Sequence, residues 1–242
     1  MKQQVLYLDL AKYYDLIYYW KDYKKEVVKL NKIIVRYKKS KGKDLLEVAC
    51  GTGHHIKYFK KTFSCTGTDI NQGMLNIAKK KIKNVTFKKA DMVNIKLNKK
   101  FDVITCLFSS LGYIKTYQNL KKTLLNFSKH LKPGGVVIIE PWYTKSAYLA
   151  GSPHMSTYDG KDLKISRLVV SKVKGNISIM DMHYLIAEKN KEVKHFIDRH
   201  EMGLFEIDKT LQFMKLAGLK SKFIKNGLMK GRGLFVGIKE LK

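Results

Sequence analysis

The stretch Glu47-Val-Ala-Cys-Gly51-Thr-Gly53-His54 indicates how the rest of the chain folds. It overlaps the apolar run at 44–49, DLLEVA, which predicts a buried strand, and it leads into residues 54–62, which predict a helix. Glycines between a strand and a helix allow a tight turn and let the backbone approach a ligand closely. The stretch therefore predicts the first unit of an α/β domain that binds a nucleoside-type ligand.

Short apolar runs and amphipathic stretches alternate on the C-terminal side of this unit. We expect further strands at 65–70, 85–88, 101–107 and 136–140, with helices at 73–83 and 120–131. A helix at 207–216 and strands at 219–225 and 234–238 complete the pattern, and residues 9–39 predict two N-terminal helices. The fold class is therefore α/β, with a doubly wound, mostly parallel, seven-stranded sheet.

The sequence pattern changes after Trp142. Residues 162–205 contain segments in which apolar and polar residues alternate, separated by polar turns. Such alternation is typical of antiparallel hairpins. We expect an inserted antiparallel sheet over residues 146–205, between two segments of the main domain at 1–145 and 206–242.

The composition sets limits on the partners. The 242 residues carry a formal net charge of +28, with 48 Lys and Arg against 20 Asp and Glu, so anionic partners are the first to consider. Only four of these cations are arginines, namely Arg36, Arg167, Arg199 and Arg232. Dispersed lysines raise the general potential, whereas arginine is favoured for planar contacts to phosphates and base edges. We therefore do not expect nucleic acid as the partner.

The cysteines and the N-terminal segment indicate the cellular compartment to expect. Cys50, Cys65 and Cys106 lie inside apolar stretches, as reduced buried thiols do, and this favours a cytoplasmic protein. The first fifteen residues lack a signal-peptide pattern, and no apolar run approaches the length of a membrane span.

The glycine stretch is followed by three further signals. A dinucleotide fingerprint would need a third glycine where Ile56 stands, and no phosphate-binding P-loop pattern occurs. Asp69 ends the second predicted strand, at the spacing from which an acid reaches ribose hydroxyls. Asp91-Met92 follows the third strand, and Leu-Lys-Pro-Gly-Gly at 131–135 precedes the fifth.

In this order the motifs resemble those of class I S-adenosylmethionine-dependent methyltransferases. The resemblance implies that the loop with Glu47, Ala49, Gly51 and Gly53 passes under the methionine part of S-adenosylmethionine. It also implies that Asp69 holds the ribose and that the residues at 91–92 flank the adenine. The full set of expected cofactor contacts comprises Tyr18, Glu47, Ala49, Gly51, Gly53, Asp69, Ile70, Met74, Asp91, Met92, Leu107 and Phe108.

A closer resemblance rests on short motifs spread along the chain. These are Tyr14-Asp-Leu, Lys21-Asp-Tyr, Phe108-Ser-Ser-Leu-Gly-Tyr113, Glu140-Pro-Trp142, His195-Phe and Gly231-Arg-Gly-Leu-Phe-Val-Gly237. They are similar to motifs of the N,N-dimethyltransferases that act on the 3-amino group of thymidine-diphospho-linked deoxysugars. The resemblance implies an amine substrate on an anionic nucleotide-sugar, N-terminal helices that cap the active site, and an inserted sheet that binds substrate and builds a homodimer.

Methyl transfer from a sulfonium is an in-line displacement, so most of the catalysis can come from holding the amine and the methyl group in line. The acceptor amine must only be neutral. We expect Tyr14 and Tyr113 to orient it, with their hydroxyls toward the amine and their rings toward the sulfonium charge. For Tyr14 the alternative is a core aromatic residue on a helix face, because three other tyrosines lie nearby in the sequence.

Four residues are expected to contact the substrate: Trp142, His183, His195 and Arg232. Arg232 lies between two glycines and could hold a diphosphate with its planar fork, or it could be a turn arginine paired to an acid. The histidines of the inserted strands, His183, His195 and His200, have no carboxylate or cysteine at metal-ligand spacing, so we expect no metal there and instead hydrogen bonds to substrate or core.

Other functions remain open. The charge allows an RNA methyltransferase, although neither the [N/D]-P-P-[Y/F] segment of adenine-N6 enzymes nor the Pro-Cys nucleophile of cytosine-C5 enzymes is present at 105–110. A free small amine or an amino acid could replace the sugar as acceptor. A noncatalytic module that binds S-adenosylmethionine is the third alternative.

Overall fold

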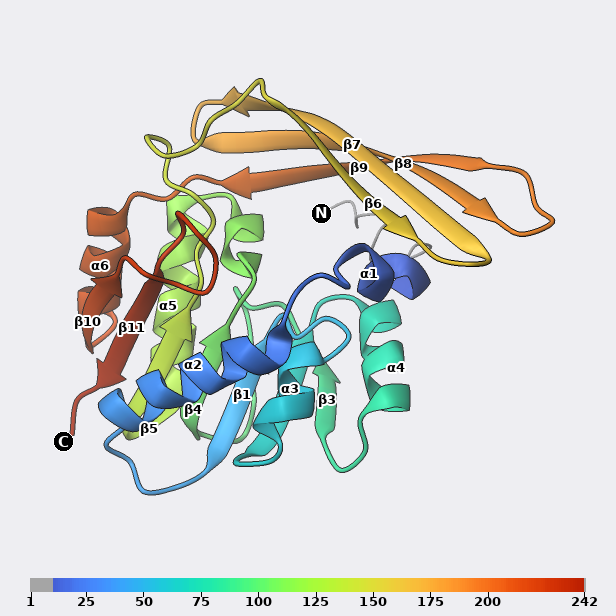
Figure 1. Cartoon of the computed structure of the whole chain (residues 1–242). Coiled ribbons are helices and arrows are strands. Elements are labelled where there is room, and N and C mark those ends of the chain that lie inside the picture. Colours follow the sequence, from blue (N-terminus) through green and yellow to red (C-terminus); the bar gives the residue numbers. More distant parts are fainter. Residues whose placement is uncertain (1–10, 242) are drawn as a thin grey trace.

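The computed structural model describes residues 11–241, which form one large mixed sheet, the helices that cover it, and a second smaller sheet (Figure 1). The large sheet has the strand order β10-β11-β5-β4-β1-β2-β3, and the first five strands of the chain run parallel within it. The strands are β1 (Asp44–Val48), β2 (Ser64–Asp69), β3 (Thr86–Lys89), β4 (Phe101–Cys106), β5 (Leu131–Ile139), β10 (Leu219–Ile224) and β11 (Leu234–Lys239).

Helices cover both faces of this sheet, as the apolar stripes of the sequence require. One face carries α2 (Tyr23–Tyr37), α3 (His54–Phe59) and α4 (Gln72–Lys81), which bury Leu30, Phe59 and Leu75 against it. The other face carries α5 (Tyr117–His130) and α6 (Ile207–Leu216), which bury Phe127 and Met214. The predicted doubly wound fold is confirmed.

The strand order reverses between β1 and β4, which pair directly although two strands lie between them in the sequence. In doubly wound sheets, ligands bind outside the carboxyl ends of the strands at such a switch point. The glycine stretch leaves β1 at this edge, and Leu107 and Phe108 leave β4 beside it.

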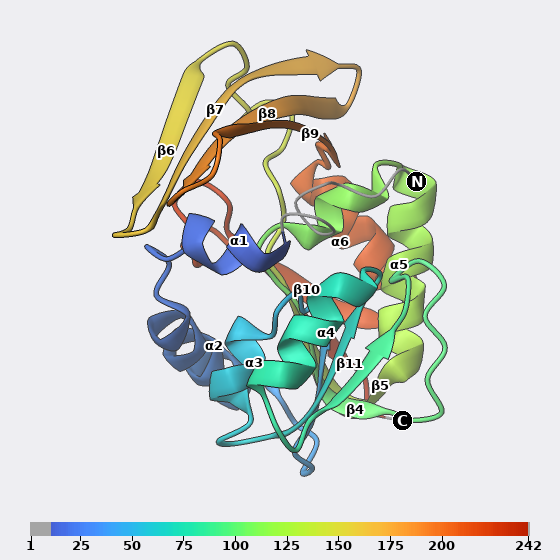
Figure 2. The same ribbon diagram turned by 90° about the vertical axis from the view of Figure 1, so that its right-hand side faces the viewer.

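The second sheet, here called the roof sheet, contains β6 (Pro153–Asp159), β7 (Leu163–Lys174), β8 (Ile177–Glu188) and β9 (Lys194–Gly203), all antiparallel. Figures 1 and 2 show that it lies over the edge of the main sheet from which the glycine stretch emerges, with α1 (Ala11–Ile17) beneath it. Its inner face packs on α1 through Ile165, Tyr184 and Ile186, which contact Tyr13 and Ile17.

The predicted inserted antiparallel sheet and the two N-terminal helices are confirmed, whereas residues 9 and 10 lie outside the described part of the chain. Two element predictions need correction. β5 begins at Leu131 rather than at 136, because Leu131 already pairs with Phe101 across a register shift. β6 was not predicted, because both faces of this edge strand are largely exposed and its sequence shows no burial alternation.

The short 3-10 helix η2 (Ser110–Ile114) was also not predicted, and it follows two consecutive residues with positive φ, Phe108 and Ser109. No helix in residues 11–241 is long and apolar enough to span a membrane. The domain boundaries at 145 and 206 stay a prediction.

Candidate active site

The glycine stretch turns sharply between β1 and α3. Ala49, Gly51 and Gly53 all have positive φ, at 55°, 54° and 81°, and a side chain at Gly53 would place its Cβ 2.6 Å from the Ile82 side chain. Asp69, at the end of β2, accepts hydrogen bonds of 2.8 Å from the backbone N–H groups of Gly51 and Asn71. Burial raises the pKa of the Asp69 carboxyl, and these backbone donors work against that rise. Asp69 therefore fixes the turn while lying at its open side.

A cleft lies at the carboxyl ends of β1 and β4. The predicted site residues that line it are Tyr14, Glu47, Ala49, Gly51, Leu107 and Phe108, and further lining comes from Tyr23, Cys50, Thr52, His54, His55 and Ser110. Glu47 is buried, and its Oε2 has no hydrogen-bond partner among the described residues. A buried carboxylate oxygen without a donor fits the cationic amino group of S-adenosylmethionine.

Four other predicted cofactor residues do not line this cleft but follow the ends of β2 and β3 at the same edge of the sheet. Met74, in the first turn of α4, lies against Gly51, since a Cβ on that glycine would be 3.4 Å from the Met74 methyl. Ile70 directly follows β2 and is exposed. Asp91 and Met92 follow β3 and are half-buried, and Asp91 accepts from the Val93 N–H at 2.9 Å. Acidic groups thus follow two neighbouring strands where a ribose and a base would bind.

An aromatic cluster closes the cleft from the α1 side. The Tyr18 ring lies 5.0 Å from the Phe108 ring, edge to face, and 4.9 Å from the Tyr14 ring. Above it, Arg167 of β7 donates to the Tyr18 hydroxyl at 3.1 Å. Aromatic faces of this kind suit a sulfonium or ammonium cation. The sequence motifs did not predict a role for Arg167. The feature that could have singled it out is that arginine is rare among the basic residues of this chain.

The short helix α1 is held to the glycine stretch by Asp15. Its carboxylate accepts from the Thr52 hydroxyl at 2.7 Å, lies 2.7 Å from His54 Nε2, and pairs with Lys81 of α4. The Tyr14-Asp-Leu motif had predicted a role for the tyrosine alone. Asp15 is the residue that keeps Tyr14 over the cleft.

Beneath the cleft lies a group of buried charges. His55 Nε2 is 2.8 Å from Glu26 and its Nδ1 is 3.1 Å from Glu47, while Lys21 pairs with the other oxygen of Glu26. Burial lowers the pKa of His55, but the hydrogen bonds to the two carboxylates outweigh it and raise the pKa to about 9. His55 is therefore charged at neutral pH and ties α2 and α3 to β1.

The turn after β4 is supported from β5. Glu140 is fully buried, and one carboxylate oxygen accepts from the Phe108 N–H at 2.7 Å. Burial raises the pKa of Glu140, and the positive charge of Lys21 opposes that rise. The Ser109 hydroxyl donates to the Pro141 carbonyl and accepts from Arg232 at 2.9 Å. These contacts hold Phe108 and Ser109 in the left-handed conformation that non-glycine residues seldom adopt.

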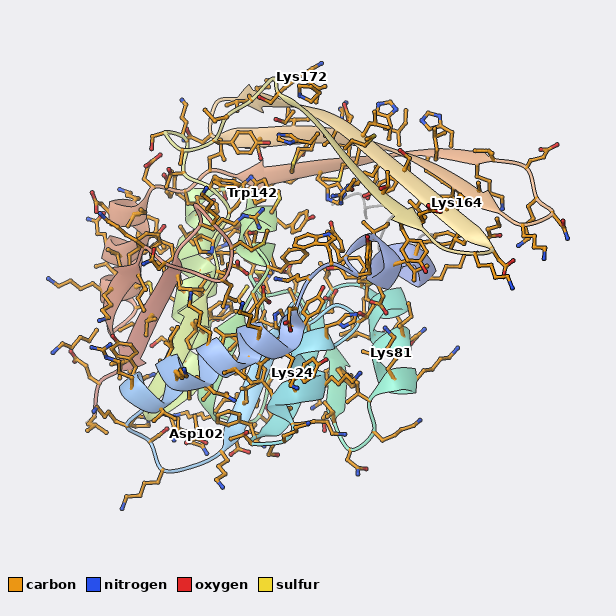
Figure 3. All side chains as sticks on the ribbon, viewed as in Figure 1. Lys24, Lys81, Asp102, Trp142, Lys164 and Lys172 are labelled. Atoms are coloured by element: carbon orange, nitrogen blue, oxygen red, sulfur yellow. The ribbon has the colours of Figure 1, made fainter. Side chains whose placement is uncertain are left out.

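Arg232 and Trp142 lie together at the other side of this turn. The Arg232 guanidinium carbon is 4.4 Å from the Trp142 ring and 5.0 Å from the Tyr143 ring, and its Nε is buried without a hydrogen-bond partner among residues 11–241. The Trp142 indole N–H donates to Ser178 of the roof sheet at 2.9 Å, and Figure 3 labels Trp142 where the roof sheet meets the main domain. The structure thus brings these two predicted residues together, beside the cleft.

His183 and His195 lie elsewhere. They stack on each other on the outer face of the roof sheet, with Nδ1 of His183 3.2 Å from Nε2 of His195, and both are exposed. The structure does not bring them to the cleft, because both point away from α1 across the roof sheet. No group of three His, Cys, Asp or Glu side chains that could hold a metal ion occurs in the described part of the chain.

Tyr113, the other predicted acceptor-side residue, lies in η2 three residues beyond the cleft-lining Ser110. Its hydroxyl is 2.7 Å from Nδ1 of His200, and Nε2 of His200 is 2.8 Å from a carboxylate oxygen of Asp198. Both β9 residues are buried. The sequence predicted a hydrogen-bonding role for His200 but gave no indication of Asp198, which lies two residues before His200 on the strand and so shares its face.

Comparisons with known proteins agree with this geometry. Residues 45–135 match a family model described as a methyltransferase domain. The chain is 36% identical over 236 residues, 96% of its length and 98% of the relative's, to the dTDP-3-amino-3,4,6-trideoxy-alpha-D-glucopyranose N,N-dimethyltransferase of Streptomyces venezuelae.

The chain belongs to this family of S-adenosylmethionine-dependent N-methyltransferases. Its structure superposes on Streptomyces venezuelae DesVI with a TM-score of 0.90 and 34% identity, covering 96% of this chain and 99% of that one. The S-adenosylmethionine-bound amino pentose methyltransferase CalS10 from Micromonospora echinaspora gives a TM-score of 0.82 at 25% identity, covering 90% and 92%. When bound, S-adenosylmethionine supplies an electrophilic methyl group, and the buried Glu47 carboxylate and the glycine turn are the features of the cleft that would hold it.

Proposed function

We propose that this methyltransferase methylates the 3-amino group of a nucleotide-linked deoxysugar. The observation that carries the proposal is the similarity over nearly the whole chain, roof sheet included, to a relative whose name specifies that substrate class. A shared catalytic domain alone would support only the transfer of a methyl group.

The proposal assigns the acceptor side to residues around the Phe108 turn. Tyr14 and Tyr113 orient the amine, and Arg232 holds the diphosphate. The unpartnered Nε of Arg232 supports this role, because a buried guanidinium N–H without an acceptor is ready for a ligand oxygen. Trp142 lies under the same guanidinium and fixes its orientation.

In the proposed reaction the residues act chiefly by positioning. A neutral amine held in line with the electrophilic methyl group needs no covalent intermediate with the protein. The cap formed by α1 and α2 excludes water from the cleft, and the Asp15 contacts keep the cap closed. The positive surface potential draws in an anionic nucleotide-sugar.

The proposal further includes a homodimer formed through the outer face of the roof sheet. That face exposes a row of large apolar side chains, from Met155, Leu168, Val170, Leu185 and Ile197. Contiguous exposed apolar side chains of this kind mark interaction surfaces. His183 and His195 lie in the same face, so a substrate contact through them would require a second subunit.

A cytoplasmic location is proposed from the three cysteines, which are buried and unpaired in the structure. RNA methylation stays the second candidate, and the charge of the chain is the observation that favours it.

The test is methyl transfer from labelled S-adenosylmethionine to a panel of nucleotide-linked 3-amino and 4-amino sugars, free amino sugars, amino acids and RNA. We expect two methyl additions, confined to a nucleotide-linked sugar. Transfer to RNA alone would overturn the proposal.

Asp69→Ala is expected to weaken cofactor binding about tenfold or more in calorimetry, because a charged hydrogen bond is lost. Arg232→Ala should raise KM for the sugar more than it lowers kcat.

A further inference from the structure

The contact between η2 and β9 joins three titratable side chains in a line. Tyr113 is half-buried, whereas His200 and Asp198 are 2% and 1% exposed. The first distance in the line is 2.7 Å, from the Tyr113 hydroxyl to Nδ1 of His200, and the second is 2.8 Å, from Nε2 of His200 to Asp198. Asp198 is thus buried in the roof sheet, and Tyr113 at the other end belongs to the short helix that begins at the cleft-lining Ser110.

The order of the three side chains determines which ring nitrogen of His200 carries the proton. Nε2 of His200 lies 2.8 Å from Asp198 but outside hydrogen-bond geometry, so the negative charge of Asp198 favours, by its field alone, the His200 tautomer that carries its proton on Nε2. Nδ1 is then the acceptor, and the Tyr113 hydroxyl donates to it. The order hydroxyl, imidazole, carboxylate is that of a histidine base for a hydroxyl group, with Asp198 acting on the ring through its charge.

The turn that carries Tyr113 is held firmly against the roof sheet. A Cβ on Gly112 would lie 2.8 Å from the Met202 side chain and 3.3 Å from Trp142, so the backbone of η2 is wedged between β9 and the chain that follows β5. Lys115 and Glu201 form an ion pair across the same contact. Tyr113 therefore has a fixed position relative to both Ser110 in the cleft and His200 in the roof sheet.

We propose that Tyr113, His200 and Asp198 form a proton relay that removes a proton from the acceptor ammonium group. The inference rests on the proposed function, because it takes an amine as the acceptor. One N–H bond of the ammonium breaks as its proton moves to the Tyr113 oxygen, while the Tyr113 O–H bond breaks and its proton moves to Nδ1 of His200. The positive charge passes from the substrate to the imidazole, where Asp198 stabilises it, and the amine becomes a neutral nucleophile.

Other charged and titratable groups surround the relay. On β8 and β7 the inner face carries Tyr184 and Arg167; burial raises the pKa of Tyr184, and the negative charge of Asp198 adds to that rise. The Lys115–Glu201 pair lies at the η2 contact. The Asp181–Arg199 pair lies on the outer face, across the sheet from His200. Asp198 is the carboxylate within hydrogen-bonding distance of the His200 ring, so it decides the charge that the ring can accept.

The relay predicts a specific pH dependence. Amines of this type titrate near pH 8, so at pH 7 most substrate arrives as ammonium and needs the relay, whereas at pH 9.5 most arrives neutral. His200→Gln can still accept a hydrogen bond from Tyr113 but cannot take up a proton. We expect kcat/KM to fall about a hundredfold at pH 7 and less than about threefold at pH 9.5. A merely structural contact would reduce kcat/KM equally at both pH values, and that result would overturn the relay.

Two variants control this measurement. Tyr113→Phe removes the entry point of the relay from its half-exposed end, so it should reproduce the pH-dependent loss if the His200 variant fails to fold. His130→Gln changes another buried, hydrogen-bonded histidine, which binds the Leu97 N–H at 3.0 Å far from the cleft. It should leave the pH profile of kcat/KM unchanged even where stability falls.

A second readout is independent of turnover. In ¹⁵N-histidine NMR of the cofactor-free protein, we expect neutral His200 to show the Nε2–H tautomer, and Asp198→Asn to abolish that preference. An Nδ1–H tautomer in the wild-type protein would overturn the relay whatever the substrate is. If no nucleotide-linked amino sugar is methylated, the proposed function fails, and the NMR result alone decides the relay.

Discussion

The two faces of the roof sheet use histidine in opposite ways. On the outer face, His183 and His195 stack on each other in solvent, among exposed apolar side chains. On the inner face, His200 is buried between a tyrosine and an aspartate. His195 and His200 belong to the same strand, but an odd separation of five residues places them on opposite faces. Parity along a strand, rather than residue type, thus decides which histidine can reach the cleft.

The largest effect expected from this difference is on stability. Tyr184 is fully buried on the inner face against Tyr13 and Ile17, while its neighbour Leu185 is 45% exposed on the outer face. We expect Tyr184→Ala to lower the free energy of unfolding by about 3–5 kcal/mol. Leu185→Ala should lower it by less than about 1 kcal/mol. Urea unfolding measures both, and equal losses would show that the two faces do not differ in burial.

A buried, ion-paired histidine also makes the free energy of unfolding depend on pH, and His55 is the clearest case. Its pKa is raised to about 9 in the folded protein, against about 6.5 in an unfolded chain. The stability that its ion pairs contribute is therefore complete below pH 6.5 and is lost as the pH rises through 9. We expect about 3 kcal/mol of pH-dependent stability to disappear over that window.

His55→Gln should remove this pH dependence, and urea unfolding at pH 6, 7.5 and 9.5 would measure it. The matched control is His154→Gln, at an exposed position on β6, which should retain the wild-type slope. A wild-type free energy of unfolding that does not change over this range would show that His55 is not charged between Glu26 and Glu47.

The smallest effect on the stability of the folded chain is expected on the outer face. Leu168 and Ile197 flank His183 in one cross-strand row. We expect Leu168→Glu to change the free energy of unfolding of the monomer by no more than about 0.5 kcal/mol. If the outer face joins two subunits, the same variant should convert a dimer into a monomer in sedimentation. A wild-type monomer would contradict the proposed homodimer.

Much of the fold followed from local pattern. The glycine stretch between Glu47 and His54, the acid at the end of β2 and the apolar stripe of α5 are local signals, and each has a direct physical cause. β6 lacked such a signal because, as an exposed edge strand, it buries little. The start of β5 at Leu131 also depended on a pairing with Phe101 that no local pattern reveals.

The candidate site divides in the same way. Tyr14, Glu47 and Phe108 were predicted, and they line one cleft. His183 and His195 were predicted to contact the substrate, although the odd spacing of His195 and His200 on one strand already places those two on opposite faces. The register of β8 with β9 then puts His183 beside His195. Arg167, His200 and Asp198 belong to none of the quoted motifs, so no local pattern indicated which side chains they contact in the folded chain.

By itself, the sequence determined the class of the fold and the cofactor edge, because a strand, a glycine turn and the acid after the next strand are set by contacts between neighbouring segments. Only the tertiary structure decided which side chains of the inserted segment face that edge. The reason is that the pairing of His200 with Tyr113 depends on the contact of β9 with η2, and the residue pairs that form this contact are 86 and 87 positions apart in the sequence. Such a contact forms only when the roof sheet packs on the main domain.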